Sequence, residues 1–255
     1  MIIDTHMHIF EKKYDEIRED VINEALEFDV KKMIAVGYDY KSSLKALELA
    51  NSYDFIYCAV GLHPSEAHKE EDEQLSWIYK LAENKKVIAI GEIGLDYYWD
   101  KTYIDIQKKM FEKQINIAKD LNLPIIIHNR ESTKDCYDIL KKYQGVSGVL
   151  HCYSASLEMA REFIKLGYYL GIGGVLTFKN SKEIKRVVKE IDLEHLLSET
   201  DSPYLTPVPF RGQINHPGYT KFVVEEISRI KNMPLEEVKK ILYDNAKKLF
   251  NLGEN

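Results

Sequence analysis

His6 and His8 stand two residues apart near the start of the chain, at the end of an apolar stretch. Because side chains alternate across a strand, both imidazoles point to the same face if residues 2–9 form a strand. Two imidazoles on one face can grip a metal ion, but histidine pairs also occur as ordinary polar residues. The pair therefore predicts a metal site only if the fold brings further ligands close to it.

Side chains of similar chemistry follow other short apolar runs along the chain. They are His63, Glu92, His128, His151 and Asp201. Five of the eight histidines thus stand where an apolar run ends, and the other three are His68, His195 and His216. A purely structural role for these histidines does not explain this concentration. Whether their side chains lie close together depends on the strands and helices that carry them.

Apolar runs alternate with stretches of helical periodicity over most of the sequence. We expect strands at residues 2–9, 33–36, 55–60, 87–90, 124–127, 149–150, 168–170 and 195–198. We expect helices at 14–28, 42–50, 73–83, 103–121, 133–143, 157–166, 182–191, 221–230 and 234–249. One long irregular stretch, residues 202–219 with four prolines, follows the last strand. Such a loop is expected to lie over the active-site face of a barrel.

This alternation predicts an α/β fold. Strands joined by helical crossovers lie parallel, and eight such units in 255 residues favour a closed (β/α)₈ TIM barrel that forms a single domain over 1–255. An open doubly wound sheet is the alternative, but the glycine-rich dinucleotide fingerprint is missing where His6 and His8 stand. In a barrel, the carboxyl ends of all strands meet at one rim. We therefore expect the histidines and carboxylates to converge there.

Nitrogen and carboxylate donors at one rim are typical ligands of divalent ions. Four histidines, His6, His8, His128 and His151, with Glu92 and Asp201, are too many for one tetrahedral ion. This number predicts two ions that share a carboxylate. Glu92, midway between the two groups of ligands, is the expected bridge.

Ordinary structural roles remain open for several of these residues. Glu92 can be a buried ion-pair partner, and Asp201 can cap the turn that follows it. His63 fits an ordinary loop as well as a contact with substrate. Tyr97, Tyr98 and Trp99 are interpreted as lid packing, with base stacking as the less favoured alternative. Asp96 and Glu199 are left without an assigned role.

Composition and charge narrow the class of protein. A net charge of −6 argues against a broadly basic surface, so a polyanionic substrate must be held by a local patch or by bound cations. We expect neither a signal peptide nor a membrane span. Three cysteines without a CxxC pair indicate buried thiols in a reducing compartment, so a cytoplasmic location is expected. No obligate protein partner is evident.

Several motifs, in this order and spacing, resemble the TatD family of metal-dependent deoxyribonucleases in the amidohydrolase-like superfamily. They are Ile3-Asp4-Thr5-His6-Met7-His8, Gly61-Leu62-His63-Pro64, Gly91-Glu92-Ile93-Gly94-Leu95-Asp96, His128-Asn129-Arg130, His151-Cys152-Tyr153-Ser154 and Glu199-Thr200-Asp201-Ser202-Pro203-Tyr204-Leu205. The resemblance covers residues 2 to about 218. It implies cleavage of DNA phosphodiesters by a metal-dependent barrel. It assigns as metal ligands His6, His8, Glu92, His128, His151 and Asp201.

The loop at 211–217 looks like the family's Arg-Gly-x-x-Asn-x-Pro pattern, through Arg211 and Asn215. A lysine is expected at position 213 and an acidic residue at 216, where this chain has Gln213 and His216. These departures concern contacts with substrate rather than the metal site. With Arg130, whose planar guanidinium suits phosphate oxygens, the loop completes a set of expected substrate-binding residues. That set is His63, Arg130, Arg211 and Asn215.

The expected reaction is hydrolysis of DNA, as a 3′–5′ exonuclease on single-stranded or frayed 3′ ends. Two divalent ions (Zn²⁺, Mn²⁺, Ni²⁺ or Mg²⁺) supply a hydroxide, Glu92 bridges the ions, and Asp201 accepts or steers the proton. A small-molecule amidohydrolase or lactonase with the same ligands is the alternative, although a bridging lysine would have favoured it more than Glu92 does. A metal-binding scaffold without turnover is a third hypothesis, and the sequence lacks none of the expected ligands.

Overall fold

A computed structural model describes residues 1–71 and 74–253 of the chain. It contains eight strands in the expected order, and each strand pairs only with the strands next to it in the sequence. All the pairings between strands are parallel. The strands are β1 (Ile2–Met7), β2 (Val30–Val36), β3 (Ile56–Val60), β4 (Val87–Asp96), β5 (Ile125–Arg130), β6 (Gly148–Leu150), β7 (Tyr168–Ile172) and β8 (Leu196–Ser198).

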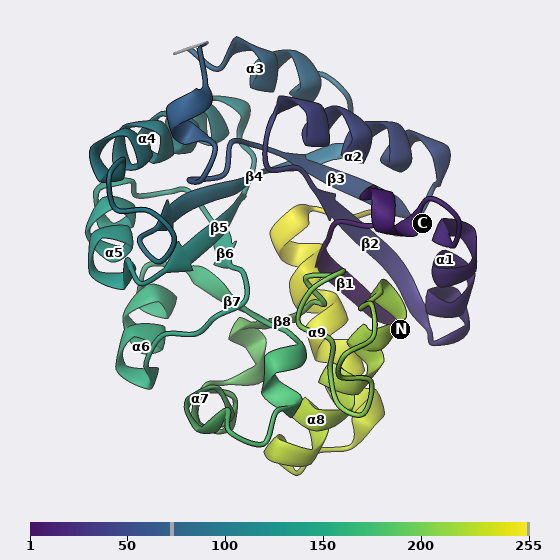
Figure 1. Ribbon diagram of the computed structural model, residues 1–255. Coiled ribbons are helices and arrows are strands. Elements are labelled where there is room, and N and C mark those ends of the chain that lie inside the picture. Colours follow the sequence, from purple (N-terminus) through teal and green to yellow (C-terminus); the bar gives the residue numbers. More distant parts are fainter. Residues whose placement is uncertain (72–73, 254–255) are drawn as a thin grey trace.

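The last strand returns to the first through a few specific contacts. Thr5 Oγ1 donates a hydrogen bond to the Ser198 carbonyl at 3.1 Å, and Ser198 Oγ donates to the Ile3 carbonyl at 3.1 Å. Beyond the strand ends, Met7 and Ser202 form an isolated parallel bridge. The sheet is therefore a nearly closed barrel, which confirms the predicted TIM-barrel architecture (Figure 1).

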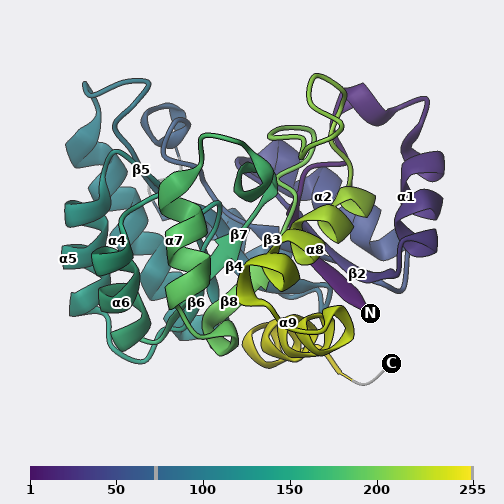
Figure 2. The same ribbon diagram turned by 90° about the horizontal axis from the view of Figure 1, so that it is seen from below.

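Helices surround the barrel, as Figure 1 shows in a view along its axis. They are α1 (Arg18–Glu27), α2 (Tyr40–Ser52), α3 (Ser76–Ala82), α4 (Ile104–Leu121), α5 (Thr133–Lys142), α6 (Leu157–Lys165), α7 (Lys182–Glu190), α8 (Thr220–Lys231) and α9 (Leu235–Phe250). In Figure 2, α9 lies across the end of the barrel where the N-terminus also lies. This end holds the starts of the parallel strands, so the opposite end is free to carry a site.

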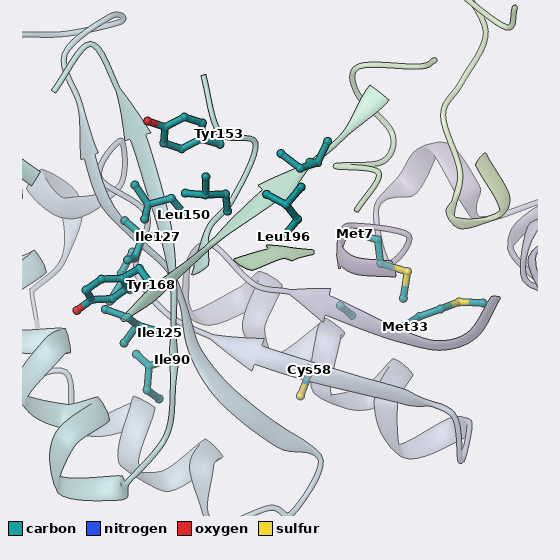
Figure 3. Close-up of a cluster of buried hydrophobic side chains, with 14 of the residues drawn as sticks. Met7, Met33, Cys58, Ile90, Ile125, Ile127, Leu150, Tyr153, Tyr168 and Leu196 are labelled. Atoms are coloured by element: carbon teal, nitrogen blue, oxygen red, sulfur yellow. The ribbon is translucent and has the colours of Figure 1, made fainter. Parts of the chain in front are cut away.

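Alternating side chains along the strands form two cores. In β2, Met33 and Ala35 belong to the larger core, which packs against the helices, whereas Ile34 and Val36 belong to a smaller one. The smaller core takes residues from seven of the strands and closes on Leu249 and other residues near the end of α9. Figure 3 shows side chains of the larger core, which separate the strands from the helices. The inner residues fill the barrel below the rim, as in a packed core rather than a pore.

Several element boundaries differ from the sequence-based expectations. Strand β4 does not end at residue 90 but continues to Asp96, because it stays paired with β5 as far as the partners Asp96 and Arg130. Glu92 and His128 therefore lie within strands rather than beyond their ends. Helix α1 begins at Arg18, after a separate 3₁₀ helix at Lys12–Tyr14.

Two further boundaries concern short elements. Helix α3 begins at Ser76, and the expected earlier start at Glu73 lies outside the described residues. A 3₁₀ helix at Leu193–His195 takes the first residue of the expected last strand, so β8 begins at Leu196.

The state of the cysteines and the apolar character of the helices can be read from the structure. All three cysteines are free thiols; Cys58 and Cys136 are buried and Cys152 is partly exposed. Within residues 1–71 and 74–253, none of the helices combines the length and the apolar character that a bilayer span requires.

Candidate metal centre

The carboxyl end of the barrel brings all six expected metal ligands together. They are His6 in β1, His8 just after it, Glu92 in β4, His128 in β5, His151 after β6 and Asp201 after β8. Five of them line a cavity of about 550 Å³, and the fully buried His6 lies beneath its floor, with its ring nitrogen facing Glu92 and Asp201. Ligands separated by up to 195 residues in sequence thus share one site.

The first group of donors contains His6, His8 and Asp201. The Nε2 atoms of His6 and His8 lie 3.2 Å apart. Asp201 Oδ1 lies 3.7 Å from the first Nε2 atom and 3.5 Å from the second. Two ligands that bind one ion at about 2.1 Å are roughly 3.0–3.4 Å apart in octahedral or tetrahedral geometry. The spacing of the two imidazoles fits a shared cation.

Contacts with the backbone help to set which nitrogen His8 presents. His8 Nδ1 lies 2.7 Å from the Val36 carbonyl oxygen. Because a carbonyl oxygen only accepts hydrogen bonds, Nδ1 carries the proton, and the lone pair of the neutral ring is on Nε2. His8 therefore turns a metal-ligating nitrogen toward His6.

The second group of donors contains His128, His151 and His63. Their ring nitrogens lie 2.8, 3.0 and 3.5 Å, respectively, from Glu92 Oε1. The other carboxylate oxygen, Oε2, faces the first group, at 3.5 Å from His6 Nε2 and 3.9 Å from His8 Nε2. Glu92 thus presents one oxygen to each group, which is the arrangement of a carboxylate that bridges two ions.

Asp96 supports His128 from the far side of the ring. Its Oδ2 atom lies 2.9 Å from His128 Nε2, which leaves Nδ1 directed at Glu92. A carboxylate behind an imidazole fixes the ring and its tautomer in many metal sites. The sequence carried a signal for this residue, because positions 92, 94 and 96 share one face of a continuous strand. A strand predicted to end at residue 90 leaves Asp96 outside this face, and so without a role.

Glu199 has a corresponding place behind two other ligands. Its Oε1 atom accepts a hydrogen bond from the Cys152 backbone N–H and lies 3.6 Å from His151 Nδ1. Glu199 Oε2, His6 Nδ1 and His151 Nδ1 are buried and have no hydrogen-bond partner. The rings of His6 and His151 stack with centroids 3.9 Å apart, and both lie near Glu199. One buried carboxylate therefore stands behind a ligand of each group.

Gly171 makes room for this carboxylate. A Cβ atom at position 171 would lie 2.4 Å from Glu199 Oε2 and 3.0 Å from the Cα atom of His151. A larger residue in β7 would therefore displace the Glu199 carboxylate from its place behind the two histidines.

Burial and the charges within the cluster set its protonation. Burial alone would raise the pKa of Glu92, but His151, His63 and His128 outweigh it and hold the pKa well below its usual value. Burial alone would lower the pKa of His151, but Glu92 and Glu199 raise it well above its usual value. For His63, burial and the nearby His128 lower the pKa to about 3. Without a cation, protons on the histidines balance the carboxylates, and a bound metal would replace them.

The donor set fits two divalent ions. Histidine nitrogens and carboxylate oxygens suit Zn²⁺, Mn²⁺ and Ni²⁺, and carboxylates also suit Mg²⁺. The spacing of 3.2 Å between the His6 and His8 Nε2 atoms, and the Glu92 carboxylate between the two groups, match the spacing of ligands around shared ions. Three groups of residues in this cluster have atoms close enough to hold a metal ion.

The expected substrate-binding residues divide into two pairs. His63 and Arg130 line the cavity. Arg211 and Asn215 are not among the described residues that do so. The Arg211 guanidinium stacks 4.0 Å from the centre of the Phe178 ring and donates to the Thr206 carbonyl.

Asn215 belongs to the loop at 202–219 and is fully buried. Its side-chain amide donates to the carbonyls of Thr200 at 2.8 Å and Tyr204 at 2.6 Å. This residue shapes the loop next to Asp201, and a direct contact with substrate stays a prediction.

A parallel barrel with histidine and carboxylate donors gathered at the carboxyl ends of its strands is the architecture of a metal-dependent hydrolase. Residues 3–251 match the family model described as TatD related DNase, and the chain belongs to this family. The resemblance seen in the motifs is thereby confirmed.

Individual relatives agree with this assignment. The chain is 48% identical to the uncharacterized metal-dependent hydrolase YabD of Bacillus subtilis, over 99% of this chain and 100% of the relative. It is 39% identical to the uncharacterized metal-dependent hydrolase MJ1582 of Methanocaldococcus jannaschii, over 97% and 96% of the two chains. Among solved structures, the TatD homolog YjjV of Escherichia coli superposes with a TM-score of 0.93 at 31% identity, over 99% and 98% of the chains.

Proposed function

We propose that this metal-dependent hydrolase is a deoxyribonuclease that removes nucleotides from single-stranded or frayed 3′ ends. The observation that carries the proposal is Glu92, with one carboxylate oxygen facing each of two histidine groups. Two ions so bridged suit the attacking and the leaving oxygens of a phosphodiester. The family to which the chain belongs is described as DNases, which favours DNA over other phosphodiesters.

The proposed ligands are His6, His8 and Asp201 for one ion and His128 and His151 for the other, with Glu92 shared. Divalent ions held there would lower the pKa of a bound water toward neutrality and offset the charge of the scissile phosphate. Asp96 and Glu199 hold the imidazoles in place from behind.

Asp201 is the proposed proton acceptor. Burial would raise the pKa of Asp201, but its contact with His8 and the charges of His151 and His6 outweigh burial and lower it. The side chain is therefore an ionised carboxylate near neutral pH, able to take a proton from an attacking water. Its exposed fraction is larger than that of Glu92, so it faces the open cavity.

His63 and Arg130 are the proposed contacts for the phosphate. His63 is neutral because burial holds its pKa at about 3, so it offers a hydrogen bond rather than a charge. Arg130 supplies a planar guanidinium at the cavity wall, which suits phosphate oxygens. A local cation next to bound metal lets a protein of net charge −6 bind a polyanion.

The depth of the centre favours a chain end as substrate. Glu92 is 5% exposed, so the scissile phosphate must enter the cavity to reach it. An intact duplex keeps its bases stacked and paired, and unpairing and unstacking one nucleotide costs a few kcal/mol. A frayed or single-stranded end avoids much of this cost.

The test compares substrates and ions directly. Protein purified without added metal is analysed for metal content and then assayed with Zn²⁺, Mn²⁺, Ni²⁺ and Mg²⁺ on a 5′-labelled single strand, its duplex, and panels of esters and lactones. We expect stepwise shortening from the 3′ end, faster on the single strand. Turnover of a lactone or ester without cleavage of DNA would replace the proposal with the amidohydrolase alternative. Bound metal without turnover of any of these substrates would support the hypothesis of a metal-binding scaffold.

A further inference from the structure

Two exposed aromatic side chains stand at the mouth of the metal cavity. Trp99 is 71% exposed and Tyr204 is 52% exposed, and both line the cavity together with Glu92 and Asp201. The exposure of Trp99 contradicts its interpretation as lid packing, because a packed lid would cover the indole. Large aromatic surfaces left in water beside a site commonly mark contacts with a ligand.

The fold places these two residues on opposite sides of the mouth. Trp99 follows β4, and Tyr204 follows β8. In a sheet of eight strands in the order β1 to β8, β4 and β8 lie across the barrel from each other (Figure 1). The two rings therefore flank the entrance, with the metal centre between and beneath them.

Trp99 is tied to the metal centre through the backbone. Asp96, which holds His128, also accepts hydrogen bonds from the backbone N–H groups of Tyr98 at 2.9 Å and Trp99 at 3.3 Å. The turn that carries the indole is thus anchored to the same carboxylate as a metal ligand. A group bound on the indole would keep a fixed relation to the centre.

A positive charge lies next to this aromatic surface. The Arg130 guanidinium lies 3.9 Å from the centre of the Tyr98 ring and 5.3 Å from that of Trp99. A cation beside a flat aromatic surface offers a nucleotide one place for its phosphate and another for its base. A partner protein would not require the continuity of this surface with the metal cavity.

We propose that Trp99 and Tyr204 are the stacking surfaces of a subsite for the terminal, unpaired nucleobase of the substrate. This inference rests on the proposed function and names the part of the substrate that is recognised. A base can stack only after leaving its pair, so the subsite selects single-stranded ends. Stacking does not distinguish the four bases strongly, so digestion tolerates any terminal base.

Tryptophan fluorescence tests the subsite without relying on turnover. The chain has only two tryptophans, and Trp77 donates its Nε1–H to Glu70 and is not among the described residues lining the cavity. The metal-loaded protein is titrated with an oligothymidylate protected by 3′ phosphorothioate linkages, and with the same strand ending in an abasic deoxyribose. We expect the first strand to quench the fluorescence and to bind about 5- to 150-fold more tightly than the second. Equal binding of the two strands would overturn the subsite.

Substitutions then identify the stacking residues. Trp99→Leu and Tyr204→Leu should each raise KM for the single strand about 5- to 150-fold, while Trp99→Phe, which keeps an aromatic face, should change it less. Tyr40→Leu is the matched control, because Tyr40 is an exposed aromatic residue that packs on Trp77 outside the described cavity lining. Circular dichroism checks that each variant is folded.

The outcomes separate this inference from the proposed function. Cleavage of DNA with an unchanged KM in Trp99→Leu and Tyr204→Leu would refute the subsite and leave the deoxyribonuclease proposal standing. Absence of both binding and cleavage of any DNA by the wild-type protein would refute both. Loss of the preference for a base-bearing over an abasic end in Trp99→Leu alone would support the indole and remove Tyr204 from the subsite.

Discussion

Glu92 contacts donors of both histidine groups, so a single substitution reaches the whole centre. Its Oε1 and Oε2 atoms face different imidazoles, and the side chain is buried. The alternative role of Glu92 as a partner in an ordinary buried ion pair makes a different prediction, because such a pair can be lost without loss of metal.

Glu92→Ala should abolish metal-dependent cleavage while the barrel remains folded. Removal of one group that stabilises the reacting charges costs about 10²–10³-fold in rate, and loss of the shared ligand should cost at least that much. The measurements are the cleavage rate at saturating metal, the metal content and the circular dichroism spectrum. Glu92→Gln keeps the shape of the side chain and serves as the matched variant. Full nuclease activity in Glu92→Ala would refute the mechanism.

The position of Glu199 behind the histidines predicts an effect on metal affinity rather than on the rate of cleavage. It stands behind His6 and His151, one from each donor group, so Glu199→Gln should weaken binding at both positions. Substitution of residues that orient ligands typically lowers metal affinity about 10- to 100-fold. Competition with a coloured chelator measures the affinity and the number of ions. Asp96→Asn is the comparison, because Asp96 contacts only His128 among the ligands and should weaken one ion.

An unchanged affinity for both ions in Glu199→Gln, with a lower melting temperature, would assign Glu199 a structural role only.

At the scale of elements, the loop at 202–219 determines where Asp201 and Tyr204 stand. Asn215 holds the carbonyls of Thr200 and Tyr204, and the Tyr14 hydroxyl donates to the Asn215 carbonyl at 2.5 Å. Tyr14 is itself fully buried. Residues from the start of the chain thus fix a loop that follows the last strand.

Asn215→Ala should lower both stability and activity. It leaves two carbonyls without their donor, at a cost of about 1–3 kcal/mol in the free energy of unfolding, and it frees the segment that carries Asp201. Urea unfolding gives the stability, and steady-state kinetics give kcat and KM. A residue that merely touched the substrate would raise KM and leave the unfolding curve unchanged, so that result would contradict the structural role.

The period and the order of the apolar runs were enough to predict the barrel and the convergence of the six proposed ligands. The alternation of a strand placed His6 and His8 on one face, and parallel crossovers brought distant strand ends to one rim. Strand ends were predicted less well. Glu92 and Asp96 read as loop residues because polar side chains interrupt the apolar run, although pairing with β5 continues through them.

Other features depend on packing that no local pattern reports. Which ring nitrogen a histidine presents is set by groups behind it, such as Asp96 and the Val36 carbonyl. The burial of Asn215 depends on contacts with residues 14, 200 and 204, far apart along the chain or across a loop. A motif can name such a residue, but it does not say whether the side chain meets substrate or supports the loop.

For the whole molecule, we expect metal binding to stabilise the folded barrel. The centre joins β1, β4, β5, β6 and the segment after β8, so ions bind the folded state and not the unfolded chain. Chelation should therefore lower the melting temperature. Each ion at 100 times its dissociation constant stabilises the fold by about 2.7 kcal/mol, so two ions contribute about 5.4 kcal/mol, or roughly 10–20 °C for a domain of this size.

Calorimetry with and without EDTA measures this shift. Glu92→Ala provides the control, since a variant without the shared ligand should show little response to the chelator. An identical melting temperature for the wild-type protein in both conditions would contradict the coupling.

The closure of the barrel also has a consequence during synthesis. The Asp201 backbone N–H donates to the His6 carbonyl at 2.9 Å, so the first and last ligands are set against each other only when β8 reaches β1. A nascent chain still lacking residue 201 has no complete centre, and neither has a fragment truncated before it. We therefore expect fragments that end before residue 201, which lack a proposed ligand, to have no metal-dependent activity.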